Sequence, residues 1–144
     1  MPSKEWSKLN NLQVGRYGEI YAMMEFLSYG MDVYPSEVDD HGVDMLVKST
    51  SGRYHEIQIK TVNKSKYVIV DNKSVDDTSR SYYVCLLILE EGNMPEIFLI
   101  PRTAWGDTST KLFVNREYEY GINISNKNMV LLRTYSFDKM IKEL

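Results

Sequence analysis

Two strand-like segments separated by a short turn constrain the fold of this chain more than any other feature. Residues 43–47 are apolar except for Asp44, residues 54–62 are rich in Tyr, Ile, Thr and Val, and Ser51-Gly52 lies between the two segments. Strand-forming runs joined by a short turn that contains glycine are typical of a β-hairpin. We therefore expect an antiparallel pair of strands, Val43–Ser49 and Tyr54–Val62, within a larger sheet.

The segments around this hairpin predict a sheet flanked by helices. Leu12 to Tyr29 contains helix formers with apolar side chains on most sides, and Gly30 suits the C-terminal end of a helix. Tyr82–Leu89 is a continuous apolar run, as expected for a central strand covered on both faces. This order predicts one α/β (α+β) domain over residues 1–144, with a mixed central β-sheet flanked by helices. The other expected elements are strands at Met31–Tyr34 (ended by Pro35), Tyr67–Val70, Glu96–Ile100, Lys111–Val114 and Gly121–Ile124, a loop at Asp71–Arg80, a helical turn at Thr103–Trp105 and a terminal helix at Phe137–Leu144.

Composition and charge disfavour several classes of protein. The formal net charge of -3 and the pI of about 5.4 disfavour a DNA coat or architectural protein, because phosphate binding is electrostatic. They do not exclude an enzyme, in which a metal ion and a few local cations serve one phosphate. The single cysteine, Cys85, excludes an internal disulfide and a cysteine-based zinc cluster, and we expect it to be buried. No targeting segment is visible and no apolar stretch reaches the ~18 residues of a membrane span, so we expect a cytoplasmic protein with no membrane partner.

The hairpin also places polar residues where they can act together. Side chains alternate along a strand, so Glu56, Gln58 and Lys60 share one face while the isoleucines between them share the other. Asp44 interrupts an apolar run on the preceding strand, where aspartate is disfavoured. A carboxylate, an amide oxygen and an ammonium group in one small space suit phosphodiester hydrolysis with Mg²⁺ (or Mn²⁺), which prefers oxygen ligands. The alternative interpretation is an exposed hairpin with an ordinary Asp–Lys pair, because any exposed sheet face shows polar alternation.

Asp44 followed by Gln58-Ile59-Lys60 resembles the signature of the PD-(D/E)XK (restriction-endonuclease-like) nuclease superfamily. The flanking motifs Gly15-Arg16-Tyr17-Gly18-Glu19 and His41-Gly42-Val43-Asp44 are also similar to members of this superfamily. Glutamine in the acidic position resembles its Mrr-like and Holliday-junction-resolvase-like branches. The resemblance covers roughly Leu12 to Val62, and the remainder is similar, more loosely, to small bacterial domains of the superfamily. It implies a restriction-endonuclease-like core and a Mg²⁺-dependent endonuclease that acts on nucleic acid, with DNA as the expected substrate.

The resemblance also implies roles for particular residues. Asp44, Gln58 and the main-chain carbonyl of Ile59 would hold the metal ion, and Lys60 would assist catalysis. Two positions depart from the usual pattern: Val43 stands where a proline is common, and Gln58 replaces a carboxylate. By resemblance, Glu19 on the first helix supplies the missing charge and joins the catalytic and metal-binding residues. Glu56, two residues before Gln58 on the same strand face, is the second candidate for that charge.

The remaining candidates have an ordinary structural interpretation beside the functional one. Arg16, Lys64 and Lys66 are candidate nucleic-acid contacts, although the two lysines also suit a solvated loop. His41 and Asp40 lie in a turn-forming segment, and Asp40 is a weaker metal-ligand candidate. His55 faces away from Gln58 and is expected to be structural.

Two functions from different classes stay open. The first is the metal-dependent endonuclease. The second is a catalytically silent domain of the same fold that binds nucleic acid or another protein, which Gln58 and the acidic pI favour. A homodimer is also expected, because two copies would double the basic contacts to a duplex and present two sites to its two strands.

Overall fold

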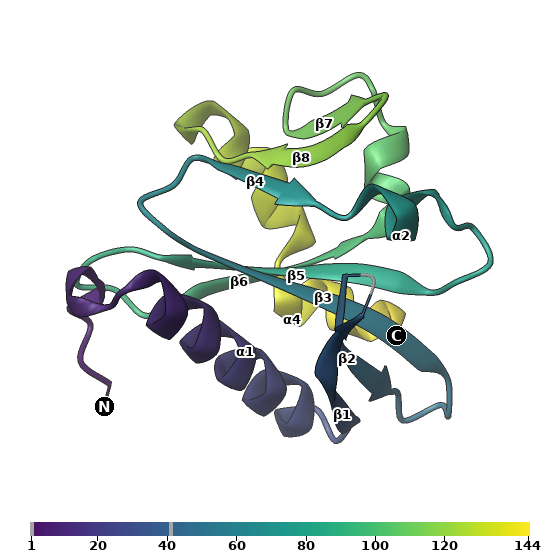
Figure 1. Ribbon diagram of the computed structural model, residues 1–144, viewed down its shortest axis with the longest axis horizontal. Coiled ribbons are helices and arrows are strands. Elements are labelled where there is room, and N and C mark those ends of the chain that lie inside the picture. The colour runs from purple at the N-terminus through teal and green to yellow at the C-terminus, as the bar shows by residue number, and fades with distance from the viewer. Residues whose placement is uncertain (1, 41) are drawn as a thin grey trace.

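The computed structural model describes residues 2–40 and 42–144, which form two β-sheets with helices packed on both sides (Figure 1). The main sheet has five strands in the order β1-β2-β3-β5-β6. The second sheet has three strands in the order β4-β8-β7 and covers one face of the main sheet, while α1 and α4 cover the other. The helices and strands are α1 (Asn11–Ser28), β1 (Asp32–Asp40), β2 (Val43–Lys48), β3 (Tyr54–Asn63), β4 (Tyr67–Val70), α2 (Asn72–Asp76), β5 (Tyr82–Leu89), β6 (Glu96–Pro101), β7 (Phe113–Arg116), β8 (Glu119–Asn123), α3 (Met129–Leu132) and α4 (Phe137–Met140).

The expected hairpin is confirmed, and its second strand, β3, is the middle strand of the main sheet. Strands β2 and β3 pair antiparallel, with Met45 opposite Ile57 and Lys48 opposite Tyr54. Strand β3 then pairs in parallel with β5, and β5 pairs antiparallel with β6. The sheet is therefore mixed, as the sequence predicted. A parallel pair needs a long connection, and here β4 and α2 lie between the two strands.

The two faces of the main sheet bury different sets of side chains. The face towards α1 and α4 packs residues of β2, β3 and β5 such as Met45, Ile57 and Cys85. The opposite face packs Tyr82, Val84 and Leu86 of β5 against the second sheet. Gln58 is level with Val84 and Lys60 with Leu86, so both belong to this second face. Cys85 is completely buried, as expected, and burial raises the pKa of its thiol.

Helix α1 begins and ends where local chemistry dictates. Asn10 accepts a hydrogen bond from the main-chain N–H of Gln13, and the Gln13 side chain accepts one from Asn10, which forms a reciprocal capping box. Gly30 follows the helix with a φ of +79°, a conformation that favours glycine. The helix rests on β3 at Gly18, where an added Cβ would lie 1.7 Å from the Thr61 hydroxyl oxygen. This close approach brings the N-terminal half of α1 to the strand that carries Lys60.

Three expected elements are wrong in extent or kind, and β7 and β8 begin two residues after and two residues before their expected starts, respectively. Strand β1 does not stop at Pro35 but continues to Asp40; Pro35 pairs with Met45, and the register shifts between Pro35 and Asp40. An edge strand tolerates proline because its outer N–H groups need no partner in the sheet. The expected loop at 71–80 contains the short helix α2, capped by the Asp71 carboxylate. The terminal helix ends at Met140 and continues as a 3-10 turn at Ile141–Glu143.

Within the described ranges, no helix is long and apolar enough to cross a membrane.

Candidate active site

One surface cavity contains the residues that the sequence singled out. Glu19, Asp44, Gln58, Ile59 and Lys60 all line it, and its volume is about 730 Å³. Its wall is completed by Arg16 from α1 and by residues of β1 and β2, namely Pro35, Ser36, Glu37 and Val43. Segments up to about forty residues apart in the sequence therefore meet at this place, where α1, β1, β2 and β3 converge.

Asp44 is fixed by β3 rather than left to solvent. The main-chain N–H of Ile59 donates a hydrogen bond to Asp44 Oδ2 at 2.6 Å. Continuing the β2–β3 register by one pair puts Asp44 level with Gln58, on the face that also carries Lys60. The N–H and C=O of one strand residue face the same neighbour. The Ile59 carbonyl is therefore directed to the β2 side, beside the Asp44 carboxylate.

Gln58 is 7% exposed, and its amide oxygen is already engaged. The Tyr82 hydroxyl donates to Gln58 Oε1 at 2.9 Å, and the main-chain N–H of Asp71 donates to the same atom at 3.3 Å. An amide oxygen has two lone pairs, and two donors use both of them. The atom that the sequence assigned to the metal ion is thus turned into the protein, towards β5 and the start of α2.

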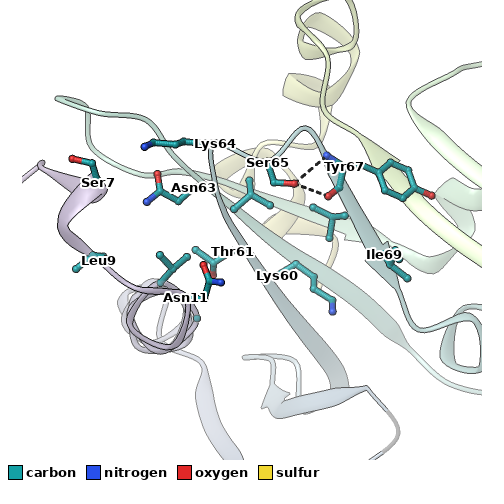
Figure 2. A pocket seen from close by; sticks show the side chains of 14 residues that line it. Ser7, Leu9, Asn11, Lys60, Thr61, Asn63, Lys64, Ser65, Tyr67 and Ile69 are labelled. Atoms are coloured by element: carbon teal, nitrogen blue, oxygen red, sulfur yellow. Dashed lines mark hydrogen bonds between the residues drawn. The ribbon is translucent and has the colours of Figure 1, made fainter.

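Lys60 lies where three depressions of the surface meet. It lines the cavity of Asp44, a shallower one that contains Gln58 and Asp71, and a third of about 650 Å³ that runs between β3, β4 and the start of α1 (Figure 2). Among residues 2–40 and 42–144, its ammonium group has no hydrogen-bond or ion-pair partner. The lysine is therefore available to a ligand.

The other predicted basic residues are spread over this surface. Arg16 is on the wall of the Asp44 cavity. Lys64 lines the third cavity, at the end away from Lys60 (Figure 2). Lys66 lines neither; it faces a separate depression with Glu96 and Arg133. Arg16 and Lys64 thus each share a cavity with Lys60, whereas Lys66 does not.

Glu19 reaches the cavity from α1 and has an ion-pair partner. Its Oε2 lies 3.5 Å from the guanidinium of Arg16, one turn earlier on the helix. The two side chains are 41% and 71% exposed, respectively. Such an exposed pair is weak and easily exchanged for another cation, because water screens it. Glu19 can therefore turn to a ligand in the cavity at little cost.

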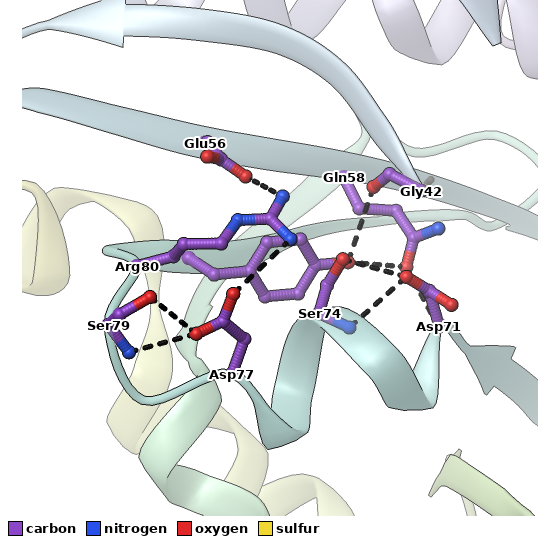
Figure 3. A network of polar contacts seen from close by, with 9 residues as sticks. Gly42, Glu56, Gln58, Asp71, Ser74, Asp77, Ser79 and Arg80 are labelled. Atoms are coloured by element: carbon purple, nitrogen blue, oxygen red, sulfur yellow. Dashed lines mark hydrogen bonds and ion pairs between the residues drawn. The ribbon is translucent and has the colours of Figure 1, made fainter. Parts of the chain in front are cut away.

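The alternative candidates lie away from this place. Glu56 forms an ion pair with Arg80 (Figure 3) and does not line the Asp44 cavity. His55 is buried, contacts Ser81 Oγ through Nδ1 at 2.6 Å and packs edge-on against Tyr83, which is the expected structural role. His41 and the side chain of Asp40 lie outside the described residues.

Sequence reasoning missed two residues beside Gln58. Tyr82 is fully buried, and its hydroxyl also lies 3.3 Å from the Gly42 carbonyl. Burial raises the pKa of Tyr82, and the negative charges of Asp71 and Asp44 raise it further, so the hydroxyl keeps its proton and remains a donor. Asp71 accepts hydrogen bonds from the main chain and hydroxyl of Ser74 and packs against Gly42 (Figure 3). Only the Asp71-x-x-Ser74 spacing, typical of a helix N-terminus, gave any signal of this in the sequence.

The donor set fits a hard cation of the Mg²⁺ type. Asp44 and Glu19 supply carboxylates, and Ile59 supplies a carbonyl oxygen; Mg²⁺ usually takes only one or two carboxylates and keeps several waters. In the described part of the chain, no three His, Cys, Asp or Glu side chains gather into a metal-binding group. A zinc-like site built from side chains alone is therefore not present among these residues, whereas a water-rich magnesium site is compatible with them.

Comparison with known proteins bears on the fold. No protein-family model matches the sequence, and no curated protein sequence matches it. Among the solved structures that match, two are similar to it over nearly their whole length. Hjc, a Holliday junction resolvase from the archaeal hyperthermophile Archaeoglobus fulgidus, has a TM-score of 0.59 at 12% identity and covers 89% of this chain and 95% of its own. The bacterial homing endonuclease I-Ssp6803I has a TM-score of 0.51 at 14% identity, covering 88% and 94%. This mixed sheet with its flanking helices is the restriction-endonuclease-like fold that the sequence motifs implied.

Proposed function

We propose that this protein is a metal-dependent endonuclease that hydrolyses phosphodiester bonds in nucleic acid, specifically DNA. The observation that carries the proposal is the single cavity in which Asp44, Lys60, Glu19 and the backbone of Ile59 meet. The fold it shares with two nucleases, Hjc and I-Ssp6803I, supports the same conclusion. Hjc is named as a Holliday junction resolvase and I-Ssp6803I as a homing endonuclease.

Asp44, Glu19 and the Ile59 carbonyl would hold Mg²⁺ or Mn²⁺ at this site. When bound, such an ion polarises the phosphate and lowers the pKa of a bound water. Asp44 is held in place by the Ile59 N–H, so one carboxylate oxygen is fixed and the group is oriented before substrate arrives. Lys60 carries a positive charge on the same sheet face, where it can offset the negative charge that develops on the phosphate. Arg16 can release Glu19 and contact a neighbouring phosphate.

The second candidate function is a catalytically silent domain of the same fold that binds nucleic acid or a protein. The engaged oxygen of Gln58 favours it, because that position offers the site no carboxylate and no free acceptor. The two functions differ in two measurable respects. The silent domain would bind its partner without divalent metal and would leave phosphodiester bonds intact.

A cleavage assay separates them. Duplex DNA, branched DNA, single-stranded DNA and RNA would be incubated with the protein in Mg²⁺, in Mn²⁺ and in chelator. We expect metal-dependent cleavage of DNA that is lost, by a factor of about a hundred or more, in Lys60→Ala and in Asp44→Asn. Lys66→Ala is the matched control, because this lysine lies outside the cavity, and it should retain most of the activity. Equal cleavage by wild type and Lys60→Ala would contradict the proposal.

We also propose that the protein acts as a homodimer. Ile20, Met24 and Leu27 follow one another at helical spacing on α1 and are 40%, 55% and 55% exposed. A second copy of this chain would cover these apolar side chains by two-fold symmetry. Pairing would also bring a second set of Arg16, Lys60 and Lys64 to a duplex, which matters for a chain whose net charge is -3.

A further inference from the structure

The hydrogen bonds around Gln58 decide which end of its amide faces a ligand. The two donors at Gln58 Oε1 are not equivalent: Tyr82 donates through a hydroxyl, whereas Asp71 donates through a main-chain N–H. A hydroxyl can also accept, but a main-chain N–H can only donate. Exchanging the amide oxygen and nitrogen would therefore set an NH₂ group against an N–H group. The network fixes the orientation of this amide, which geometry alone leaves ambiguous in other glutamines.

The amide nitrogen of Gln58, Nε2, is consequently the polar atom of this side chain that can contact a ligand. Figure 3 shows the Gln58 oxygen beside Asp71 and the nitrogen on the other side of the amide. Across the described residues, Nε2 has no acceptor within hydrogen-bonding distance. Gln58 lines both the Asp44 cavity and the shallower depression that contains Asp71. The side chain thus presents two N–H donors, and not a lone pair, at the boundary of the two.

The neighbours of Gln58 show what kind of group would accept those donors. Lys60 follows two residues later on the same face and lines the same two depressions. A neutral NH₂ group and an ammonium group side by side match two oxygens of one anionic group. The nearby carboxylates of Asp44 and Asp71 would repel such an anion, and a glutamate at position 58 would add to the repulsion. An amide avoids that charge and contributes donors instead.

We infer that Gln58 binds a non-bridging phosphate oxygen of the nucleic-acid substrate, together with Lys60, and does not ligate the metal ion. The inference rests on the proposed function for the identity of the substrate. Tyr82 and the N–H of Asp71 are the positioning groups, because they hold the amide with its nitrogen outward. Metal binding is left to Asp44, the Ile59 carbonyl and Glu19.

The test measures metal binding and substrate binding separately, with no need for turnover. Mn²⁺ binding to the free protein would be followed by isothermal titration calorimetry. Binding of a short fluorescein-labelled DNA duplex would be followed by anisotropy in Ca²⁺. Gln58→Met removes the amide and keeps the length of the side chain. We expect it to weaken duplex binding by about tenfold, the effect of losing hydrogen bonds to a charged group, and to change the Mn²⁺ dissociation constant less than about twofold. Asp44→Asn, by contrast, should weaken Mn²⁺ binding by about tenfold or more, because it removes a carboxylate ligand.

Two further variants guard against a purely structural effect. In Gln58→Met, the Tyr82 hydroxyl loses its acceptor, and the double variant Gln58→Met/Tyr82→Phe removes that hydroxyl as well. The double variant should bind the duplex as weakly as Gln58→Met but melt at a higher temperature than Gln58→Met does. Gln58→Glu should bind Mn²⁺ at least as well as wild type yet bind the duplex less well. Loss of Mn²⁺ affinity in Gln58→Met comparable with that of Asp44→Asn would overturn the inference, and so would unchanged duplex binding. A wild-type protein that binds no duplex would refute the proposed function itself, and is recognised before any variant is compared.

Discussion

At the scale of single residues, the site depends on buried groups whose partners are distant in sequence. Tyr82 is 1% exposed, and its hydroxyl reaches Gln58, 24 residues earlier in the chain. His55 is 4% exposed and is held by Ser81. Each of these side chains carries a polar atom into the core, where a lost partner is costly. Their contribution can be measured independently of any activity.

Tyr82→Phe is expected to lower the free energy of unfolding by about 1 kcal/mol, because a buried hydroxyl that donates a hydrogen bond is removed. Urea denaturation followed by fluorescence would measure it. Tyr118→Phe is the matched control: Tyr118 is 83% exposed, so removal of its hydroxyl should leave the unfolding free energy unchanged. If Tyr82→Phe left the free energy of unfolding unchanged, the hydroxyl would contribute nothing to the stability of the fold.

The burial of His55 predicts a pH dependence of stability. Burial, and then the nearby Arg53, lowers the pKa of His55 below its ordinary value of 6.5. Because the folded pKa is lower than the unfolded one, the unfolded chain binds this proton more readily. Stability is therefore full above about pH 6.5 and falls as the pH drops from there towards the folded pKa. Denaturation between pH 7.5 and 5.5 would show it, and His55→Gln should lack that part of the slope. An equal slope in both proteins would contradict this assignment.

At the scale of elements, the contact between α1 and β3 positions the site. Gly18 has no room for a Cβ against Thr61, whereas Gly15, one turn earlier, has nothing within 4 Å of the position that a Cβ would occupy. The two glycines thus differ in what they do, although both stand in one motif. Gly18 lets the helix touch the strand, and Glu19 follows it directly at the rim of the cavity.

The pair gives a matched experiment. Gly18→Ala is expected to lower the unfolding free energy by about 1–3 kcal/mol, because the added methyl group forces the helix away from Thr61. Gly15→Ala is expected to raise it by up to about 1 kcal/mol, because alanine favours the helix. Thermal and urea denaturation would measure both. Similar effects of the two substitutions would contradict the close approach of α1 to β3.

At the scale of the whole molecule, the proposed homodimer predicts the oligomeric state in solution. We expect wild-type protein to sediment as a dimer at micromolar concentration, and Met24→Glu to shift it to a monomer, because a charge in the middle of the exposed face of α1 would be buried without a partner. Glu25→Gln, on the same helix, is the control and should remain dimeric. Analytical ultracentrifugation would decide it, and a monomeric wild type would refute the homodimer.

Local sequence patterns determined several elements of the fold and the shared sheet face of two candidate site residues. The hairpin β2–β3, the helix α1 with its end at Gly30 and the buried strand β5 follow from periodicity and turn residues, which act between neighbours in sequence. The common face of Asp44 and Lys60 follows from strand alternation together with the hairpin register, again a local rule. The amino-acid sequence is therefore sufficient to place these two residues together.

Tertiary structure alone decided the rest. The parallel pairing of β3 with β5 brings Tyr82 next to Gln58, and the start of α2 brings the Asp71 N–H to the same oxygen. These contacts turn the amide, and another long-range contact pairs Glu56 with Arg80 away from the site. No sequence period encodes them, because the direction of a buried side chain depends on which donors and charges the packed sheets bring to it. The sequence determines that position 58 lies at the site; the packing determines which atom of its side chain the site receives.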